Sequence, residues 1–128
     1  MKISENFSRH EFKCACCDKS TVDVVLVGVL EKCRAHFVRA RPDLKISISI
    51  NSGHRCEKRN TEVKGARSSR HLDGLAADFV VRGVSADDVA DFLESSYPDR
   101  FGIGRYTGRT HLDTRSDGPA RWDYRGKS

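Results

Sequence analysis

The longest periodic stretch of the chain lies between residues 21 and 40. Apolar side chains recur there at spacings of three and four, as they do along one face of an α-helix. They are Val22, Val25, Leu26, Val29, Leu30, Cys33 and Phe37. Ser20 or Thr21 can cap the start of this helix, and Pro42 marks its end. We expect this helix to be the main support of the core.

Shorter patterns predict four strands and a second helix. In chain order these are a strand at 45–50, a strand at 76–81, a helix at 86–95 and strands at 101–106 and 110–113. The first strand alternates polar and apolar side chains, whereas the second is an apolar run that indicates a mostly buried strand. Ser85 can cap the helix, and a tight turn at Thr107 and Gly108 can join the last two strands.

The remaining segments have weaker patterns. Ser8 followed by Glu11 predicts one short helical turn. Residues 54–70 are polar and predict a surface loop or a short helix, and the tail from Ser116 predicts a loop with Trp122 as its anchor. This order of elements predicts an α+β fold, with helices packed on one face of a small, mainly antiparallel sheet. A chain of 128 residues fits a single domain.

Composition and charge limit the classes of function. The chain is 38% hydrophobic and 32% charged, as in ordinary globular proteins, and its formal net charge of +5 suits an anionic partner. The first twelve residues lack the apolar region of a signal peptide, and no apolar run reaches the roughly 18 residues that span a bilayer. We therefore expect synthesis in the cytoplasm and no membrane insertion. We also expect a monomer. A nucleic-acid partner is not expected, because no recognition motif or aromatic platform is present.

Five cysteines lie at positions 14, 16, 17, 33 and 56. An odd number in a chain without a signal peptide argues against a complete disulfide framework. The CACC group at 14–17 can contribute to a second, structural metal site with Cys33 or Cys56, although it lacks the CxxC pairs typical of such sites. Buried free thiols are the simpler interpretation.

Two histidines lie in sequence surroundings that suit a metal. His71 and Asp78 are seven positions apart, and Gly74 between them permits the turn that would bring them together. Asp78 lies inside an apolar strand, where a carboxylate is costly unless it is paired or binds a metal. His111 and Asp113 are two apart on a predicted strand and therefore share a face. Catalytic zinc sites use three such protein ligands and keep one position open.

The motifs around these residues resemble the M15 family of zinc D,D-carboxypeptidases and L,D- or D,D-endopeptidases, which act on bacterial peptidoglycan. The similar motifs are SRHLDGLAADF from Ser69, GIGRY, HLDTR and RW, with SGHRC and Asn60 ahead of them. The resemblance extends from about Phe7 to Trp122 and is strongest to the short phage- and bacterium-encoded subgroup. It implies a fold of the hedgehog/D-Ala-D-Ala-peptidase type.

The resemblance also implies roles for individual residues. His71, Asp78 and His111 would bind one catalytic zinc ion. Arg55 would face the site and stabilise an oxyanion or anchor a substrate carboxylate, which makes it both a catalytic and a substrate-binding candidate. Asp113 is the nearest carboxylate and our hypothesis for the general base; the alternative is that it orients His111 or an arginine.

Three further residues are candidates for substrate contact: Ser69, Tyr106 and His54. Each also has a simpler explanation: Ser69 as a turn residue, Tyr106 as a core residue and His54 as a surface residue. The chain departs from the family at Gly108, where many relatives carry an acid, and at Arg109, where others carry a second histidine. Position 54 is His where the family more often has Tyr.

We expect a zinc metallopeptidase whose partner is the peptide of peptidoglycan, acting as a D,D-carboxypeptidase or endopeptidase. As a phage endolysin it would reach the cell wall through a holin-type pore. The alternative is a catalytically weak or inactive zinc-containing binding module of the hedgehog-like type, and Gly108 is its main support.

Overall fold

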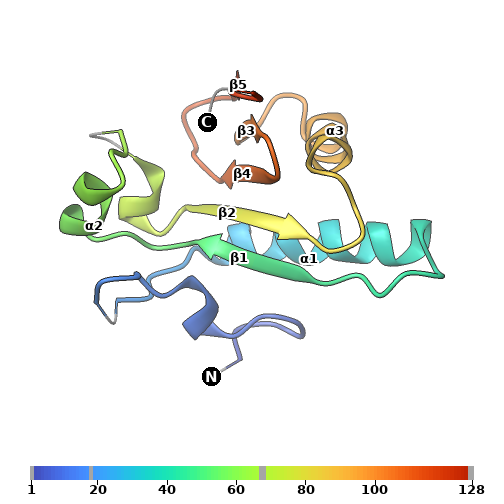
Figure 1. Ribbon diagram of the computed structural model, residues 1–128, viewed down its shortest axis with the longest axis horizontal. Coiled ribbons are helices and arrows are strands. Elements are labelled where there is room, and N and C mark those ends of the chain that lie inside the picture. Colours follow the sequence, from blue (N-terminus) through green and yellow to red (C-terminus); the bar gives the residue numbers. More distant parts are fainter. Residues whose placement is uncertain (1, 18, 67–68, 127–128) are drawn as a thin grey trace.

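The computed structural model describes residues 2–17, 19–66 and 69–126 and has an α+β architecture (Figure 1). The helices are η1 (Arg9–Phe12), α1 (Val24–Ala40), α2 (Glu57–Glu62), η2 (Arg70–Asp73) and α3 (Ala86–Ser96), of which η1 and η2 are 3-10 turns. The strands are β1 (Ile48–Ser52), β2 (Ala76–Val81), β3 (Gly102–Tyr106), β4 (Arg109–Asp113) and β5 (Ala120–Asp123). Within the described residues, none of the helices has the length and apolar character needed to cross a membrane.

The strands form one sheet in the order β1-β2-β4-β3-β5. Three neighbouring pairs are antiparallel, and β3 and β5 are parallel. The prediction of a small, mainly antiparallel sheet in an α+β fold is therefore confirmed. Figure 1 shows α1 running along β1 and β2, and α3 beside β3 and β4.

The sheet has an apolar face and a polar face, because successive side chains of a strand alternate. On β2, Ala77, Phe79 and Val81 belong to the hydrophobic core, together with Leu112 of β4 and Ile103 of β3. The core also contains side chains of α1, α3 and the N-terminal segment. The side chains between these core positions therefore face away from the core, and the candidate site is built from them.

The first long helix begins later than the pattern predicts. Asp23 is its N-cap, and its carboxylate accepts a hydrogen bond from Leu26 N at 3.2 Å. Neither predicted cap is used, because Thr21 N donates to a ring nitrogen of His54 at 3.0 Å and so belongs to the preceding loop. Val22 packs against the core from outside the helix, and Val25 is 44% exposed. The helix ends at Ala40, ahead of Pro42 as expected.

Other boundaries differ because pairing partners fix them. Strand β1 runs over 48–52 rather than 45–50, since it follows β2 through an irregularity between Ile50 and Ser52. The segment 54–70, predicted as a surface loop or a short helix, contains the short helix α2 and the start of η2, and residues 67 and 68 lie outside the described part. Strand β5 lies in the predicted C-terminal loop. The cap at Ser85, whose hydroxyl accepts from Asp88 N at 3.1 Å, is confirmed.

Candidate metal centre

Three side chains from different elements meet on the polar face of the sheet. His71 comes from η2, Asp78 from β2 and His111 from β4, and Asp78 and His111 are direct cross-strand partners. Each offers a ligand atom, and these atoms lie within 4.8 Å of one another, so the group can hold a metal ion. The three residues are 2%, 8% and 7% exposed. The turn expected at Gly74 is present, with a φ of 72° that favours glycine.

The hydrogen bonds of the two imidazoles decide which ring nitrogen faces the centre. Nδ1 of His71 lies 2.7 Å from the carbonyl oxygen of Gly53, which can only accept, so Nδ1 carries the proton. Nε2 of His71 then faces Asp78, at 3.4 Å from its Oδ2. Nε2 of His111 lies 2.8 Å from Asp113, whereas its Nδ1 lies 2.9 Å from Oδ1 of Asp78. One unprotonated nitrogen of each ring can therefore point at a shared cation, as in other histidine metal sites.

Two glycines of β3 make room for this arrangement. Gly102 is the cross-strand partner of Asp113, and a Cβ at Gly102 would overlap the Asp113 carboxylate. Gly104 lies between His111 and Trp122 on the neighbouring strands, and a Cβ there would overlap the indole of Trp122. The GIGRY motif is therefore explained by the space that the side chains of β4 and β5 need.

Asp113 is fully buried, and both of its oxygens have partners. Arg115 donates to Oδ1 from Nε at 2.7 Å and to Oδ2 from Nη2 at 2.8 Å, and His111 also contacts Oδ2. Burial alone would raise the pKa of Asp113, but the bonds from Arg115 and His111 outweigh it and hold the pKa well below its ordinary value. A carboxylate with so low a pKa accepts a proton poorly. These contacts favour the alternative, in which Asp113 orients His111.

Opposing charges also determine the protonation of the other two groups. Burial would raise the pKa of Asp78, but hydrogen bonds from His111 and His71 bring it well below its ordinary value. Burial would lower the pKa of His111, yet Asp113 and Asp78 on either side raise it. Without a metal, the two carboxylates therefore favour a protonated, positively charged His111. A metal ion bound between the same groups can supply that positive charge instead of the proton.

A cleft of about 620 Å³ opens over these residues, and Arg55, Ser69 and Tyr106 line it as well. The guanidinium of Arg55 donates to Ser52, Asn60 and Asp78 at 3.2, 3.2 and 3.3 Å. The hydroxyl of Ser69 accepts from His71 N at 3.2 Å, which is a local capping contact.

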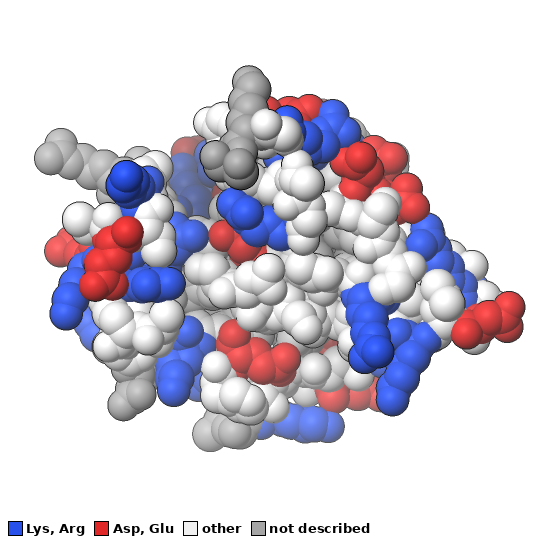
Figure 2. All heavy atoms as spheres, viewed as in Figure 1, with Lys and Arg blue, Asp and Glu red and all other residues white. Residues whose placement is uncertain are grey.

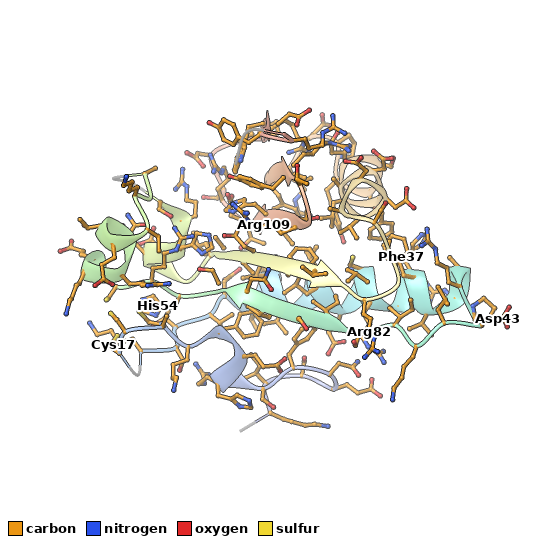
Figure 3. All side chains as sticks on the ribbon, viewed as in Figure 1. Cys17, Phe37, Asp43, His54, Arg82 and Arg109 are labelled. Atoms are coloured by element: carbon orange, nitrogen blue, oxygen red, sulfur yellow. The ribbon has the colours of Figure 1, made fainter. Side chains whose placement is uncertain are left out.

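Aromatic side chains form another wall of this cleft. The hydroxyl of Tyr106 accepts from Nε1 of Trp122 at 2.9 Å, and the indole lies 4.8 Å from the ring of His111 between centroids. Arg109, labelled in Figure 3, stacks on Tyr106 at 4.2 Å. Trp122 is thus the anchor expected in the tail, although the sequence did not indicate that it contacts the site. Arg115 was also missed, despite its position in the HLDTR motif.

His54 does not line this cleft. It lines an adjoining hollow of about 400 Å³, which shares Arg55, Asp78 and Arg109 with the cleft. Its Nδ1 accepts from Thr21 N, and burial together with nearby Lys19 lowers the pKa of the ring. The ring of His54 holds the segment before α1, and its contact with substrate stays a prediction.

An α+β fold with two imidazoles and a carboxylate converging at the floor of a cleft is an arrangement suited to metal-dependent hydrolases. The model of the family Peptidase M15 matches residues 5–113, and the chain belongs to this family. A comparison with individual curated proteins gives no match. The family resemblance found in the motifs is thus confirmed, and its subgroup stays a prediction.

Proposed function

We propose that the protein is a zinc metallopeptidase that hydrolyses the peptide part of bacterial peptidoglycan. The observation that carries this proposal is the convergence of His71, Asp78 and His111 in a cleft, with both imidazole rings held in orientation by hydrogen bonds. Membership of the M15 family supports the hydrolase class. A monomer that reaches the cell wall from the cytoplasm through a holin-type pore, as a phage endolysin does, is part of the same proposal.

The donor set fits zinc. Two neutral imidazole nitrogens and one carboxylate oxygen are ligands that catalytic zinc sites use, and three protein ligands leave one position open. When bound, zinc lowers the pKa of a coordinated water towards about 7 and polarises a carbonyl. His71 and His111 each keep the proton of their other ring nitrogen, held by Gly53 and Asp113 respectively. Asp113 thereby fixes the ring of His111, and Arg115 fixes Asp113.

The charge of the cleft supports an anionic peptide as substrate. Five cationic side chains line the cleft in the described structure against two carboxylates, those of Asp78 and Asp113. The cationic residues are Arg55, Lys64, Arg70, Arg109 and Arg115. Peptidoglycan stem peptides carry free carboxylates, which a guanidinium can bind in two places. In the proposed mechanism, Arg55 binds a substrate carboxylate or the developing oxyanion, and Tyr106 contributes to the wall beside it.

Digestion of purified muropeptides tests this function. Mass spectrometry should show a peptide bond hydrolysed by the zinc-loaded protein, loss of cleavage with a chelator and recovery when zinc is returned. His71→Ala should bind less zinc and stay inactive, while Asp117→Asn, at an exposed carboxylate paired with Arg70, should behave as the parent. Cleavage that persists in the metal-free protein would refute the proposal, and so would intact muropeptides in the presence of bound zinc.

The second candidate function is a zinc-containing binding module. It is supported by Gly108, where many relatives carry an acid, and by the two oxygens of Asp113, which are both occupied. Such a module would co-sediment with peptidoglycan and retain zinc without releasing any fragment. The digestion experiment therefore separates the two candidates.

A further inference from the structure

A second group of metal-binding side chains lies apart from the His–Asp–His centre. The thiols of Cys14, Cys16, Cys17 and Cys56 all lie within 4.8 Å of one another. Cys14 Sγ is 3.7 Å from the sulfurs of both Cys16 and Cys56, and these two are 3.0 Å apart. Figure 3 shows Cys17 at the same end of the molecule as His54, near α2.

These separations suit one tetrahedral ion. A Zn–S bond of about 2.3 Å places the sulfurs of a tetrahedral site roughly 3.8 Å apart. Among Cys14, Cys16 and Cys56, two of the three sulfur separations are close to this value, and the third requires only a small outward shift of exposed Cys16. The sulfur of Cys17 lies within 4.8 Å of the others. All of these cysteines are free thiols. Sulfur-only tetrahedral sites select zinc or iron among the common metals.

We propose that Cys14, Cys16, Cys17 and Cys56 bind a second, structural zinc ion as thiolates. Each thiol loses its proton to solvent when it binds, and no redox step is needed. Zinc with four thiolates leaves no open position, so this site is not catalytic. The inference does not rest on the peptidase function.

Backbone donors already point at the sulfurs. Cys56 N lies 3.4 Å from Cys14 Sγ, and Arg59 N lies 3.5 Å from Cys56 Sγ, so both can stabilise thiolates. A bond from Cys14 N to Lys19 O at 2.8 Å joins the two sides of the segment that carries three of the ligands. Zinc with four thiolates has a net charge of −2. Next to the cysteines in the sequence, the basic residues at 13, 19, 58 and 59 outnumber the acids Asp18 and Glu57.

Cys33 is not part of this cluster. It is fully buried on α1 among the core side chains, and burial raises the pKa of its thiol to about 12. The sequence left open whether Cys33 or Cys56 joins the CACC group, and the structure places Cys56 there. Cys33 then serves as a matched control, because it is a free thiol of the same chain outside the proposed site.

The second ion would brace the loop beside the first centre. It would join the N-terminal segment to Cys56, directly after the residues that contact the His–Asp–His centre. In that loop the Gly53 carbonyl holds the ring of His71, and Arg55 contacts Asp78. His54 N also donates to Phe12 O at 2.9 Å, so the two segments already touch. Loss of the second ion should therefore loosen the first centre without removing any of its ligands.

Metal content tests the inference directly. Protein purified under reducing conditions should contain about two zinc ions per chain by elemental analysis. His71→Ala should retain about one, and so should the double variant Cys16→Ser/Cys56→Ser, whereas Cys33→Ala should retain about two. With cobalt in place of zinc, the intense thiolate-to-metal charge-transfer band should persist in His71→Ala and disappear in the double variant.

A measurement on the unmodified chain covers the case in which a variant fails to fold. A mercurial reagent that modifies thiols should release about one zinc ion per chain, detected with a chromophoric chelator, and leave the other in place. No release, iron in place of zinc, or a Cys16–Cys56 disulfide in the intact mass of freshly purified protein would each overturn the proposal. The cobalt band in His71→Ala and the zinc released by the mercurial reagent report on the cysteine site alone. They should stay unchanged if the peptidase proposal fails, whereas the total zinc count would then fall by one.

Discussion

Replacement of Asp113 by Asn separates two roles that the carboxylate could have. As a general base, Asp113 would be needed only for proton transfer. As the partner of His111 and Arg115, it would be needed for stability and for metal affinity. The contacts at 2.7 and 2.8 Å to Arg115 and at 2.8 Å to His111 favour the second role. Asparagine has nearly the same shape, but it has no charge and presents an NH₂ group to one of these donors.

The size of the effect follows from these contacts. A hydrogen bond to a charged group contributes about 1.5–3 kcal/mol, and at least one is lost in Asp113→Asn. The side chain of Arg115 is 20% exposed, so water partly screens its lost partner. We therefore expect a loss of about 2 kcal/mol, or roughly 8 °C in Tm for a domain of this size. Metal affinity should fall roughly 10- to 100-fold, as for other partners of metal-ligating histidines.

Thermal unfolding and zinc competition with a chromophoric chelator measure these two quantities, with Asp117→Asn as the control for an exposed carboxylate. Turnover of Asp113→Asn at saturating zinc should recover to within about tenfold of the parent. The reasoning would be refuted if Asp113→Asn kept its Tm and zinc affinity while turnover at saturating zinc fell by roughly 10²–10⁴, the usual contribution of a positioned base.

Three further outcomes are expected. Gly102→Ala should lower the free energy of unfolding by about 1–3 kcal/mol and weaken metal binding, because the new Cβ would overlap the Asp113 carboxylate. Its control, Gly28→Ala, should raise the free energy of unfolding by up to about 1 kcal/mol, because Gly28 lies on α1 with open space around it. Denaturant unfolding measures both changes. Arg55→Lys should lower kcat/KM roughly 10- to 100-fold with only a small change in Tm, because Lys lacks the planar fork. The pKa values of Asp78 and Asp113 are lowered in the folded chain, so both carboxylates should stabilise the metal-free chain at pH values above 3.8, the pKa of an unfolded Asp. This contribution should be lost as the pH falls below 3.8. The free energy of unfolding should therefore change less with pH in Asp113→Asn than in the parent.

Local patterns predicted the elements that depend on local chemistry. Ser85 caps α3, and the apolar run at 76–81 forms the mostly buried strand β2. The SRHLDGLAADF motif brought His71 and Asp78 together because a glycine turn and a strand lie within ten residues. The meeting with His111 could be expected from the family motifs, but not from local pattern.

What the sequence did not predict depends on contacts between distant segments. Strand β5 has only one large apolar side chain, and its parallel pairing with β3 has no local signature. The N-cap moved to Asp23, whose carboxylate also accepts from the Thr114 hydroxyl at 2.8 Å. The pairing of Asp113 with Arg115 likewise depends on side-chain rotamers and burial. Strand alternation predicts only that His111 and Asp113 share a face of the sheet.

The fixed acceptors of the two imidazole protons affect how fast the metal can enter. A ring flip that presented the wrong nitrogen to the centre would break the bond of His71 to Gly53, or that of His111 to Asp113. The metal-free protein therefore already holds its ligand nitrogens in the orientation that the ion requires. Metal capture needs no conformational search and buries little new apolar surface. At this centre, zinc should bind in a single kinetic phase whose rate is proportional to its concentration, with a heat-capacity change near zero.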